Sequence, residues 1–236
     1  PTRRSPDLFV FFIRDAALTV FWVIGIMNSV NMLDNMDGVT ATVSACIIAC
    51  TLTLIAVAGI QSEFLFYSSL GLLGALIGFL FLNYNPSKLF MGDTGSMFLG
   101  LVLAFLGIKF FWNQPTPSGQ LIFSRQLLLP ILMFLMPIMD TTFVFVARIR
   151  RGDSPFKGGR DHITHHLHYI GLHDKMIPVV TGLVCLVSGA LVLSTLTISK
   201  GWSHFHTGLF SGYILAMFGT FFFLYRQGKR MNEERL

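Results

Sequence analysis

Carboxylate and carboxamide side chains recur at three-residue intervals in one short segment of the chain. They are Asn28, Asn31, Asp34 and Asp37, and Gly38 follows directly. A three-residue step keeps side chains near one face of a helix. Oxygen ligands of this kind suit a hard cation or the polar edge of a nucleotide. Capping of a helix–loop–helix junction by Asp and Asn is the alternative, and it accounts for one or two of these residues but not for four in register.

A second polar cluster begins at Phe90 and reads Phe-Met-Gly-Asp-Thr-Gly-Ser. Its carboxylate, Asp93, lies between two glycines where an apolar stretch starts. Backbone amides at a helix N-terminus can face an anion while a neighbouring carboxylate holds a cation. The cluster is therefore of the kind that a Mg²⁺–diphosphate complex requires.

A third cluster combines histidines with arginines. His162, His165 and His166 would span about 100° of a helix, and histidine can donate to phosphate oxygens. Arginines that would attract an anionic substrate lie nearby, at Arg148, Arg150, Arg151 and Arg160. An ordinary basic loop explains the arginines but not the histidines. A zinc site from His162 and His166 lacks an evident third ligand.

The elements that must position these clusters are long and apolar. Only 12% of the 236 residues are charged and 53% are hydrophobic, whereas soluble domains average about 25% charged residues. We expect an all-α, polytopic transmembrane bundle forming one domain over residues 1–236. Seven stretches approach the roughly 20 residues of a membrane span, at 15–31, 39–60, 63–82, 95–112, 127–147, 177–197 and 206–225. In the third, Gly71, Gly74 and Gly78 predict close helix packing.

The positive charges predict which side of the membrane holds the clusters. The segments after the first, third, fifth and seventh stretches carry Lys88, Arg148, Arg150, Arg151, Lys157, Arg160, Lys175, Arg226, Lys229, Arg230 and Arg235. The alternate segments carry only Arg125 and Lys200, with Lys109 near a helix end, although Arg3, Arg4 and Arg14 also fall on that side. The positive-inside rule places the first set in the cytoplasm, together with a His/Arg loop at 148–176.

One carboxylate lies deeper. Asp140 precedes the end of the fifth stretch by seven residues, roughly 10 Å along a helix. A charge at this depth needs a partner or a water-filled cleft. Asp140 is either a site residue or a buried structural acceptor.

In their order along the chain, these motifs resemble the polyprenyl-phosphate N-acetylhexosamine-1-phosphate transferase family. The motifs are Asn28-Ser-Val-Asn31-Met-Leu-Asp34-Asn-Met-Asp37-Gly38, Phe90-Met-Gly-Asp93-Thr-Gly-Ser96, Pro137-Ile-Met-Asp140-Thr and Ser154-Pro-Phe followed by His165-His166. The family includes the enzymes that make lipid I and those that start O-antigen, enterobacterial common antigen and teichoic acid linkage units. The last motif looks more like the second group.

The resemblance implies an enzyme of the bacterial inner membrane. The acceptor, an undecaprenyl or other polyprenyl phosphate, would attack the β-phosphorus of a UDP-N-acetylhexosamine and release UMP on the cytoplasmic face. It implies no nucleic-acid partner and allows a homodimer. Asp93 would ligate Mg²⁺ (Mn²⁺ is possible), and Asn31, Asp34 and Asp37 would line the metal and nucleotide site.

The resemblance also assigns substrate contacts. Asn83 and Phe90 fall where family members contact the uracil ring. His165 and His166 would contact the pyrophosphate or the acceptor phosphate, and Arg160 and His162 would assist substrate binding.

Two features depart from the family pattern. Members have ten or eleven helices and carry an Asp-Asp pair on an earlier cytoplasmic loop, thought to bind or activate the acceptor. No Asp-Asp occurs in this sequence. We therefore expect a chain without the first four or so family helices, which does not complete the active site alone. The usual His-x-His-His also carries an extra residue after His162, and Asn35 replaces a common Gly.

The main rival is a transporter for metal ions or protons that uses the acids as a relay and the histidines as ligands. Such proteins spread ionisable residues through the membrane depth. Here these residues gather at one predicted face, and only Asp140 lies clearly within the bilayer.

Overall fold

The computed structural model describes residues 5–112, 114, 116, 119–198 and 201–234. Arg3, Arg4, Lys200 and Arg235 of the charge pattern lie outside the described residues. The helices are α1 (Ser5–Leu33), α2 (Val39–Val57), α3 (Glu63–Asn83), α4 (Gly92–Gly107), η1 (Ile108–Trp112), α5 (Phe123–Met133), α6 (Leu135–Arg151), α7 (Ile163–Tyr169), η2 (Asp174–Met176), α8 (Ile177–Thr197) and α9 (His204–Glu233). No strand occurs among these residues, so the expected all-α class is confirmed.

Six of the helices are long and apolar enough to cross a membrane. They correspond to the first four and the last two of the predicted stretches. The fifth stretch differs from a single straight span because α5 and α6 meet at a bend of 82°. Within the described residues the total is therefore six candidate spans and one bent pair.

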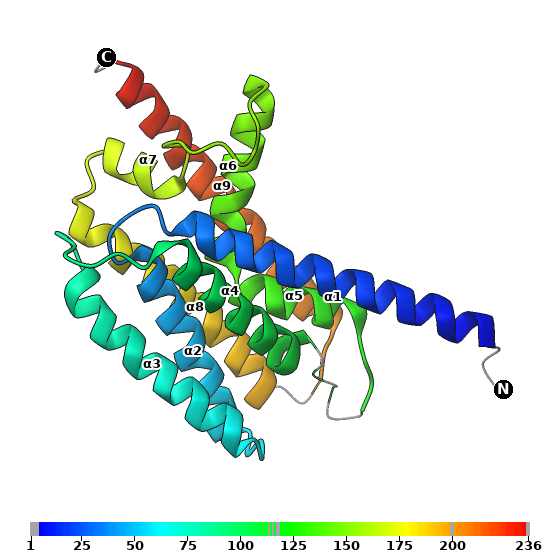
Figure 1. The fold of residues 1–236 in the computed structure, drawn as a ribbon. Coiled ribbons are helices and arrows are strands. Elements are labelled where there is room, and N and C mark those ends of the chain that lie inside the picture. Colours follow the sequence, from blue (N-terminus) through cyan, green and yellow to red (C-terminus); the bar gives the residue numbers. More distant parts are fainter. Residues whose placement is uncertain (1–4, 113, 115, 117–118, 199–200, 235–236) are drawn as a thin grey trace.

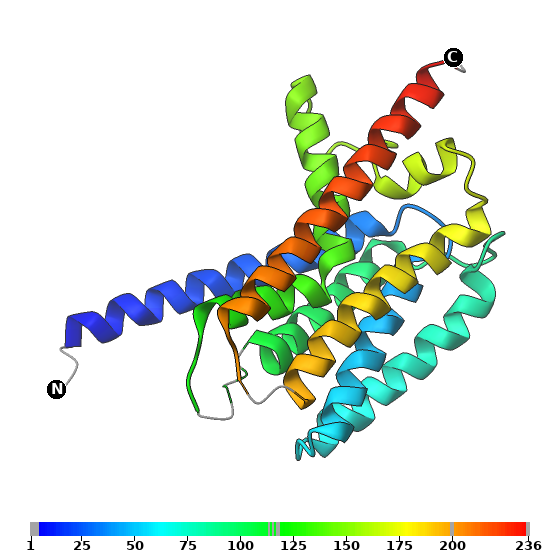
Figure 2. The same cartoon turned by 180° about the vertical axis from the view of Figure 1, so that it is seen from behind.

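Proline explains why the fifth stretch breaks. Pro130 lies inside α5 and Pro137 lies in the first turn of α6. Each ring removes a backbone donor and crowds the preceding turn. Phe134, between the two helices, leaves helical geometry with φ −102° and ψ 21°. As a result α6 projects out of the bundle, beside the C-terminal half of α9 (Figures 1 and 2).

The bundle is built on two helix pairs. α2 packs between α8 and α3, and α1 packs along α4 (Figure 1). The α1–α4 contact is close: a Cβ on Gly100 would lie 2.7 Å from the Cα of Met27. Farther along, the Trp22 indole donates to the carbonyl of Ala104 at 3.1 Å. These contacts fix how far α4 can slide along α1.

The linkers that carry the polar motifs meet at one end of the bundle, called here the motif end. It comprises the ends of α1, α3 and α6 and the starts of α2, α4 and α8. Side-chain hydrogen bonds join these segments, including one from the Tyr84 hydroxyl to the carbonyl of Lys175 at 2.5 Å. Residues 148–176, expected as a loop, include α7 and η2.

Candidate functional site

The first and second motifs meet where α1 ends and α4 begins. The Asn31 amide donates to Asp93 Oδ1 at 3.2 Å and to the Ser96 hydroxyl at 2.9 Å. Ser96 is fully buried and also bonds back to its own helix turn. Asp93 itself is exposed. The carboxylate is thus held in place from one side and open on the other.

Asp34 adds a second carboxylate to this place. It lies in the turn after α1 and is partly buried. Burial, and to a smaller extent the negative charge of Asp93, raises the pKa of Asp34. Two carboxylates that repel one another favour a bound cation between or beside them.

The Asp37 carboxylate binds the loop after α3 instead of Asp93 or Asn31. Its carboxylate accepts three hydrogen bonds, from the Asn85 amide at 3.1 Å and from the backbone N–H and hydroxyl of Ser87 at 3.1 and 2.8 Å. It therefore fastens the loop after α3 to the loop after α1. Asn28 also turns away, because its amide donates to the carbonyl of Ile24 in its own helix. The expectation that all four residues share one face is wrong, since the chain leaves helical geometry after Leu33.

Asn83 is buried, and its side chain links two backbone groups. Its Oδ1 accepts from the Gly38 N–H at 3.0 Å and its amide donates to the carbonyl of Leu89 at 2.8 Å. Gly38 has a φ of +73° and precedes α2, a conformation that favours glycine. Phe90, by contrast, is 75% exposed at the motif end. Phe90 therefore has an accessible ring for the predicted uracil contact. Asn83 instead holds the loop that carries Phe90.

Asp140 and His162 form a buried pair. Asp140 Oδ2 lies 2.8 Å from His162 Nδ1, and Oδ1 accepts from the Ile163 N–H at 2.7 Å. Asp140 is fully buried. Of the two readings of Asp140, the structure shows the buried acceptor. His162 precedes α7 in extended conformation, so it is not part of the helix expected for the three histidines.

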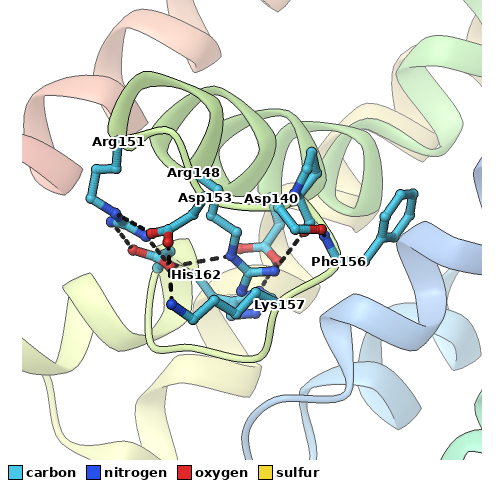
Figure 3. A network of polar contacts seen from close by, with 10 residues as sticks. Asp140, Arg148, Arg151, Asp153, Phe156, Lys157 and His162 are labelled. Carbon is cyan, nitrogen blue, oxygen red and sulfur yellow. Dashed lines mark hydrogen bonds and ion pairs between the residues drawn. The ribbon is translucent and has the colours of Figure 1, made fainter.

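A network of arginines and aspartates folds the segment after α6 back onto that helix (Figure 3). Arg148 is buried and bonds to Asp161 at 3.2 Å and to the carbonyl of Pro155 at 2.7 Å. Arg151 also binds Asp161, at 2.5 and 2.9 Å. Hydrogen bonds from Arg151 and Arg148 lower the pKa of Asp161 to about 2. Arg148 and Arg151, expected to attract substrate, are thus committed to an internal ion-pair network.

Helix α7 presents two faces. On one, the Thr164 hydroxyl donates to Asn35 Oδ1 at 2.5 Å, which ties α7 to the turn carrying Asp34. On the other, the His166 ring contacts the Tyr225 ring of α9, with centroids 3.8 Å apart and ring planes inclined at 43°. His165 is partly exposed, while His166 is buried. His165 and His166, which were given the same role from the sequence, therefore lie in different surroundings.

Burial also sets the charge of these two rings. Desolvation, assisted for His165 by the nearby His162, lowers the pKa of both His165 and His166 to about 4. Both are neutral at pH 7. They can accept or donate one hydrogen bond per nitrogen but add no positive charge.

The donor set fits a divalent ion only in part. Among the described residues, no three His, Cys, Asp or Glu side chains gather closely enough to hold a metal. The zinc interpretation therefore gains no support. Mg²⁺ commonly takes one or two carboxylates and completes its shell with water and substrate phosphates. Asp93 and Asp34 fit an ion that binds together with a diphosphate.

Sequence reasoning missed several of the residues that build this site. Ser96, Asn35, Ser87 and Thr164 are small polar residues that link one motif to another. Ser96 and Asn35 lie inside recognised motifs, which was an available signal. The others have partners up to 129 positions away, so nothing local marks them.

The sequence matches the model of glycosyl transferase family 4 over residues 5–111. A probable undecaprenyl-phosphate N-acetylglucosaminyl 1-phosphate transferase of Bacillus subtilis is 35% identical over 183 residues, 77% of this chain and 49% of the relative. The chain belongs to glycosyl transferase family 4.

Other relatives of family 4 are more distant. A decaprenyl-phosphate N-acetylglucosaminephosphotransferase of Mycolicibacterium smegmatis is 31% identical over 65% of this chain and 40% of the relative. A phospho-N-acetylmuramoyl-pentapeptide-transferase of Carboxydothermus hydrogenoformans is 31% identical over 75% of this chain and 49% of the relative. The chain thus spans about half the length of the family 4 relatives it matches, or less.

Proposed function

We propose that the protein transfers an N-acetylhexosamine 1-phosphate from a UDP-N-acetylhexosamine to a polyprenyl phosphate and releases UMP. The named relatives are all transferases, and none is a transporter. The observation that carries the proposal is the hydrogen bond between Asn31 and Asp93. It joins two motifs 62 residues apart at a place where a diphosphate could lie.

In the proposed reaction a phosphate oxygen of the acceptor bonds to the β-phosphorus of the UDP-sugar. The bond from that phosphorus to the bridging oxygen breaks, and UMP leaves with the electron pair. Such a transition state needs charge neutralisation and alignment more than covalent chemistry. A bound Mg²⁺ or Mn²⁺ would supply the neutralisation.

The residues of this chain have distinct parts in the proposal. Asp93 and Asp34 would hold the ion, and the diphosphate would bind to that ion. Asn31 fixes the Asp93 carboxylate, and Asp37 fixes the loop that leads to Phe90. Neutral His165, the more exposed of the two adjacent histidines, is placed to hydrogen-bond a phosphate oxygen.

The reaction is proposed for the cytoplasmic face of a bacterial inner membrane. Exposed cations gather at the motif end, including Lys88, Arg150, Arg160 and Lys175. The positive-inside rule assigns such an end to the cytoplasm, where nucleotide sugars are available.

The test measures formation of a lipid-linked sugar in membranes containing the full-length protein, radiolabelled UDP-N-acetylhexosamine, undecaprenyl phosphate and Mg²⁺. Asp93→Asn keeps the size of the side chain and removes its charge, so we expect at least about a hundredfold loss of product formation. Glu63→Gln is the matched control, because Glu63 is exposed at the opposite end of the bundle. Full activity of Asp93→Asn would overturn the proposed site.

A further inference from the structure

A pocket of about 380 Å³ lies between α7, the segment before it, and the C-terminal end of α9. Its walls include Arg160 before α7, His166 and Tyr169 on α7, and Tyr225, Lys229 and Asn232 on α9. No residue of the first two motifs lines it. The proposed transfer reaction does not use this pocket.

The pocket holds polar groups without partners. Within the described chain, no hydrogen bond is made by the Arg160 guanidinium, the Tyr169 and Tyr225 hydroxyls or the Asn232 amide. His166 Nδ1 is buried and has no partner there. A buried polar atom without a partner, such as His166 Nδ1, is costly unless a ligand or water satisfies it. The more exposed groups beside it are free to bind the same ligand.

Of the two carboxylates in the same pocket, Asp161 is already occupied and Glu233 is only loosely paired. Both oxygens of Asp161 bind Arg148 and Arg151. Glu233 lies 3.9 Å from Lys229, a loose contact on an exposed helix end. The pocket thus offers an excess of donors, and two of them, Arg160 and Lys229, are positively charged. An anion with several acceptor oxygens satisfies such a set.

The level of the pocket along α9 indicates a phosphate. Phe222 and Phe223 on α9 are exposed apolar side chains, and Arg226, Lys229 and Arg230 follow within two turns. A change along a helix from exposed apolar side chains to cations marks the boundary of a bilayer. A pocket at that level lies where lipid phosphates are concentrated.

Helix α7 separates the pocket from the Asp34 turn. Thr164 faces that turn through Asn35, whereas His166 faces α9. The α7–α9 contact is tight, because a Cβ on Gly228 would lie 2.5 Å from the carbonyl oxygen of His166. The wall that carries His166 is therefore fixed in position.

We propose that this pocket is a second anion site, which binds a phosphate group at the membrane surface on the opposite side of α7 from Asn35. The inference goes beyond the proposed transfer reaction. It also reassigns Arg160, predicted from sequence as a substrate contact, to the second site. The phosphate could belong to an anionic lipid head group or to a soluble phosphate.

The experiment measures binding and needs no enzymatic activity. The purified full-length protein, in neutral detergent micelles, is titrated with phosphatidylglycerol, with phosphatidylcholine and, separately, with inorganic phosphate. Retained lipid is counted by native mass spectrometry, and the midpoint of thermal unfolding is followed. A ligand that binds only the folded state raises that midpoint.

Three variants test the pocket. Arg160→Gln with Lys229→Gln removes both of these charges, and Tyr225→Phe removes one hydroxyl while keeping the ring that contacts His166. We expect the double variant to weaken binding about tenfold or more and Tyr225→Phe to weaken it less. Arg150→Gln is the matched control, since Arg150 is exposed but does not line the pocket.

Each outcome has a defined meaning. Saturable binding of phosphatidylglycerol alone, lost in the double variant, identifies a lipid head group. Saturable binding of inorganic phosphate, lost in the same variant, identifies a soluble phosphate. Absence of both, or an equal loss in Arg150→Gln, overturns the second site. None of these results depends on whether sugar transfer occurs, so failure here and failure of the proposed function are separable.

Discussion

Asp140 affects the rest of the site only by holding one backbone turn and one histidine in place. Its two oxygens receive His162 Nδ1 and the Ile163 N–H, which together fix the start of α7. Asp93 is accessible from solvent, whereas Asp140 is fully enclosed. At the residue scale, therefore, burial distinguishes aspartates with a structural role from aspartates that are accessible to a substrate.

Replacing Asp140 tests this role. Asp140→Ala leaves two buried groups without partners, and each loss costs about 1–3 kcal/mol. We expect the free energy of unfolding to fall by about 2–4 kcal/mol, measured by thermal or denaturant unfolding in detergent. Asp15→Ala is the control, because Asp15 pairs with Arg14 in an exposed ion pair worth about 0–1 kcal/mol. Equal effects of both variants would contradict the buried role.

The two neutral histidines predict a pH dependence of stability. Their folded pKa of about 4 lies below the ordinary value of 6.5, so the unfolded chain binds more protons between these values. Stability is then full above pH 6.5 and is lost as the pH falls toward 4. Asp161, with a pKa of about 2, stays ionised over this window.

The measurement is the midpoint of thermal unfolding between pH 7.5 and 4.5. We expect it to fall with pH in the wild type and to fall less steeply in His166→Gln. A midpoint that is flat over this range would show that these rings are not buried in the neutral form.

At the scale of elements, the bent α5–α6 pair and the tight α1–α4 pair have different physical origins. The bend follows from missing backbone donors at Pro130 and Pro137, which a sequence displays openly. The close approach of α1 and α4 follows from one glycine among 22 in the chain. Its importance appears only when the backbone of Met27 is seen beside it.

Gly100→Ala tests whether the α1–α4 distance sets the site. The new Cβ would meet the Met27 backbone at 2.7 Å and cannot be accommodated by a rotamer change. We expect destabilisation of about 1–3 kcal/mol and a loss of transferase activity, because Asn31 moves away from Asp93. Thermal unfolding and the lipid-linked product assay measure the two effects.

Gly78→Ala is the matched control for Gly100→Ala. A Cβ at Gly78 would meet no described atom within 4 Å, so we expect no loss. The same holds for Gly71 and Gly74, so the predicted close packing at these three glycines is not seen. A Gly100→Ala protein as stable and active as Gly78→Ala would show that the helix contact is softer than its geometry indicates.

At the scale of the whole molecule, all polar motifs lie at one end of an otherwise apolar bundle. The three cysteines are free, and none is exposed. A cysteine-free background can therefore be prepared with three small substitutions, and single cysteines can then report which side of the membrane a segment faces. The homodimer that the resemblance allows stays untested.

Labelling of introduced cysteines tests the proposed orientation. Lys157→Cys lies at the motif end and Gln120→Cys lies in the α4–α5 connection, and both positions are exposed. We expect a membrane-impermeant maleimide added to intact cells to label only Gln120→Cys, and both after lysis. Labelling of Lys157→Cys in intact cells would place the motif end outside and would remove access to nucleotide sugars.

The sequence by itself determined the helical class, the approximate spans and the gathering of polar motifs at one membrane face. These properties follow from local hydrophobicity, charge and linker position, each of which acts within a few turns. Family membership likewise rests on the order and content of the motifs. Phe90 and Asp93 were recognisable for the same reason, because their motif is contiguous.

The tertiary structure alone decided which polar residues face one another. Asp34 lies within electrostatic range of Asp93, Asp37 binds Ser87, and His166 packs on Tyr225 instead of the acids. A side chain's direction depends on where its helix ends and on what packs against it from elsewhere in the chain. Spacing in sequence predicts side-chain direction only within a regular helix. Beyond the residue where the helix ends, it predicts nothing about that direction.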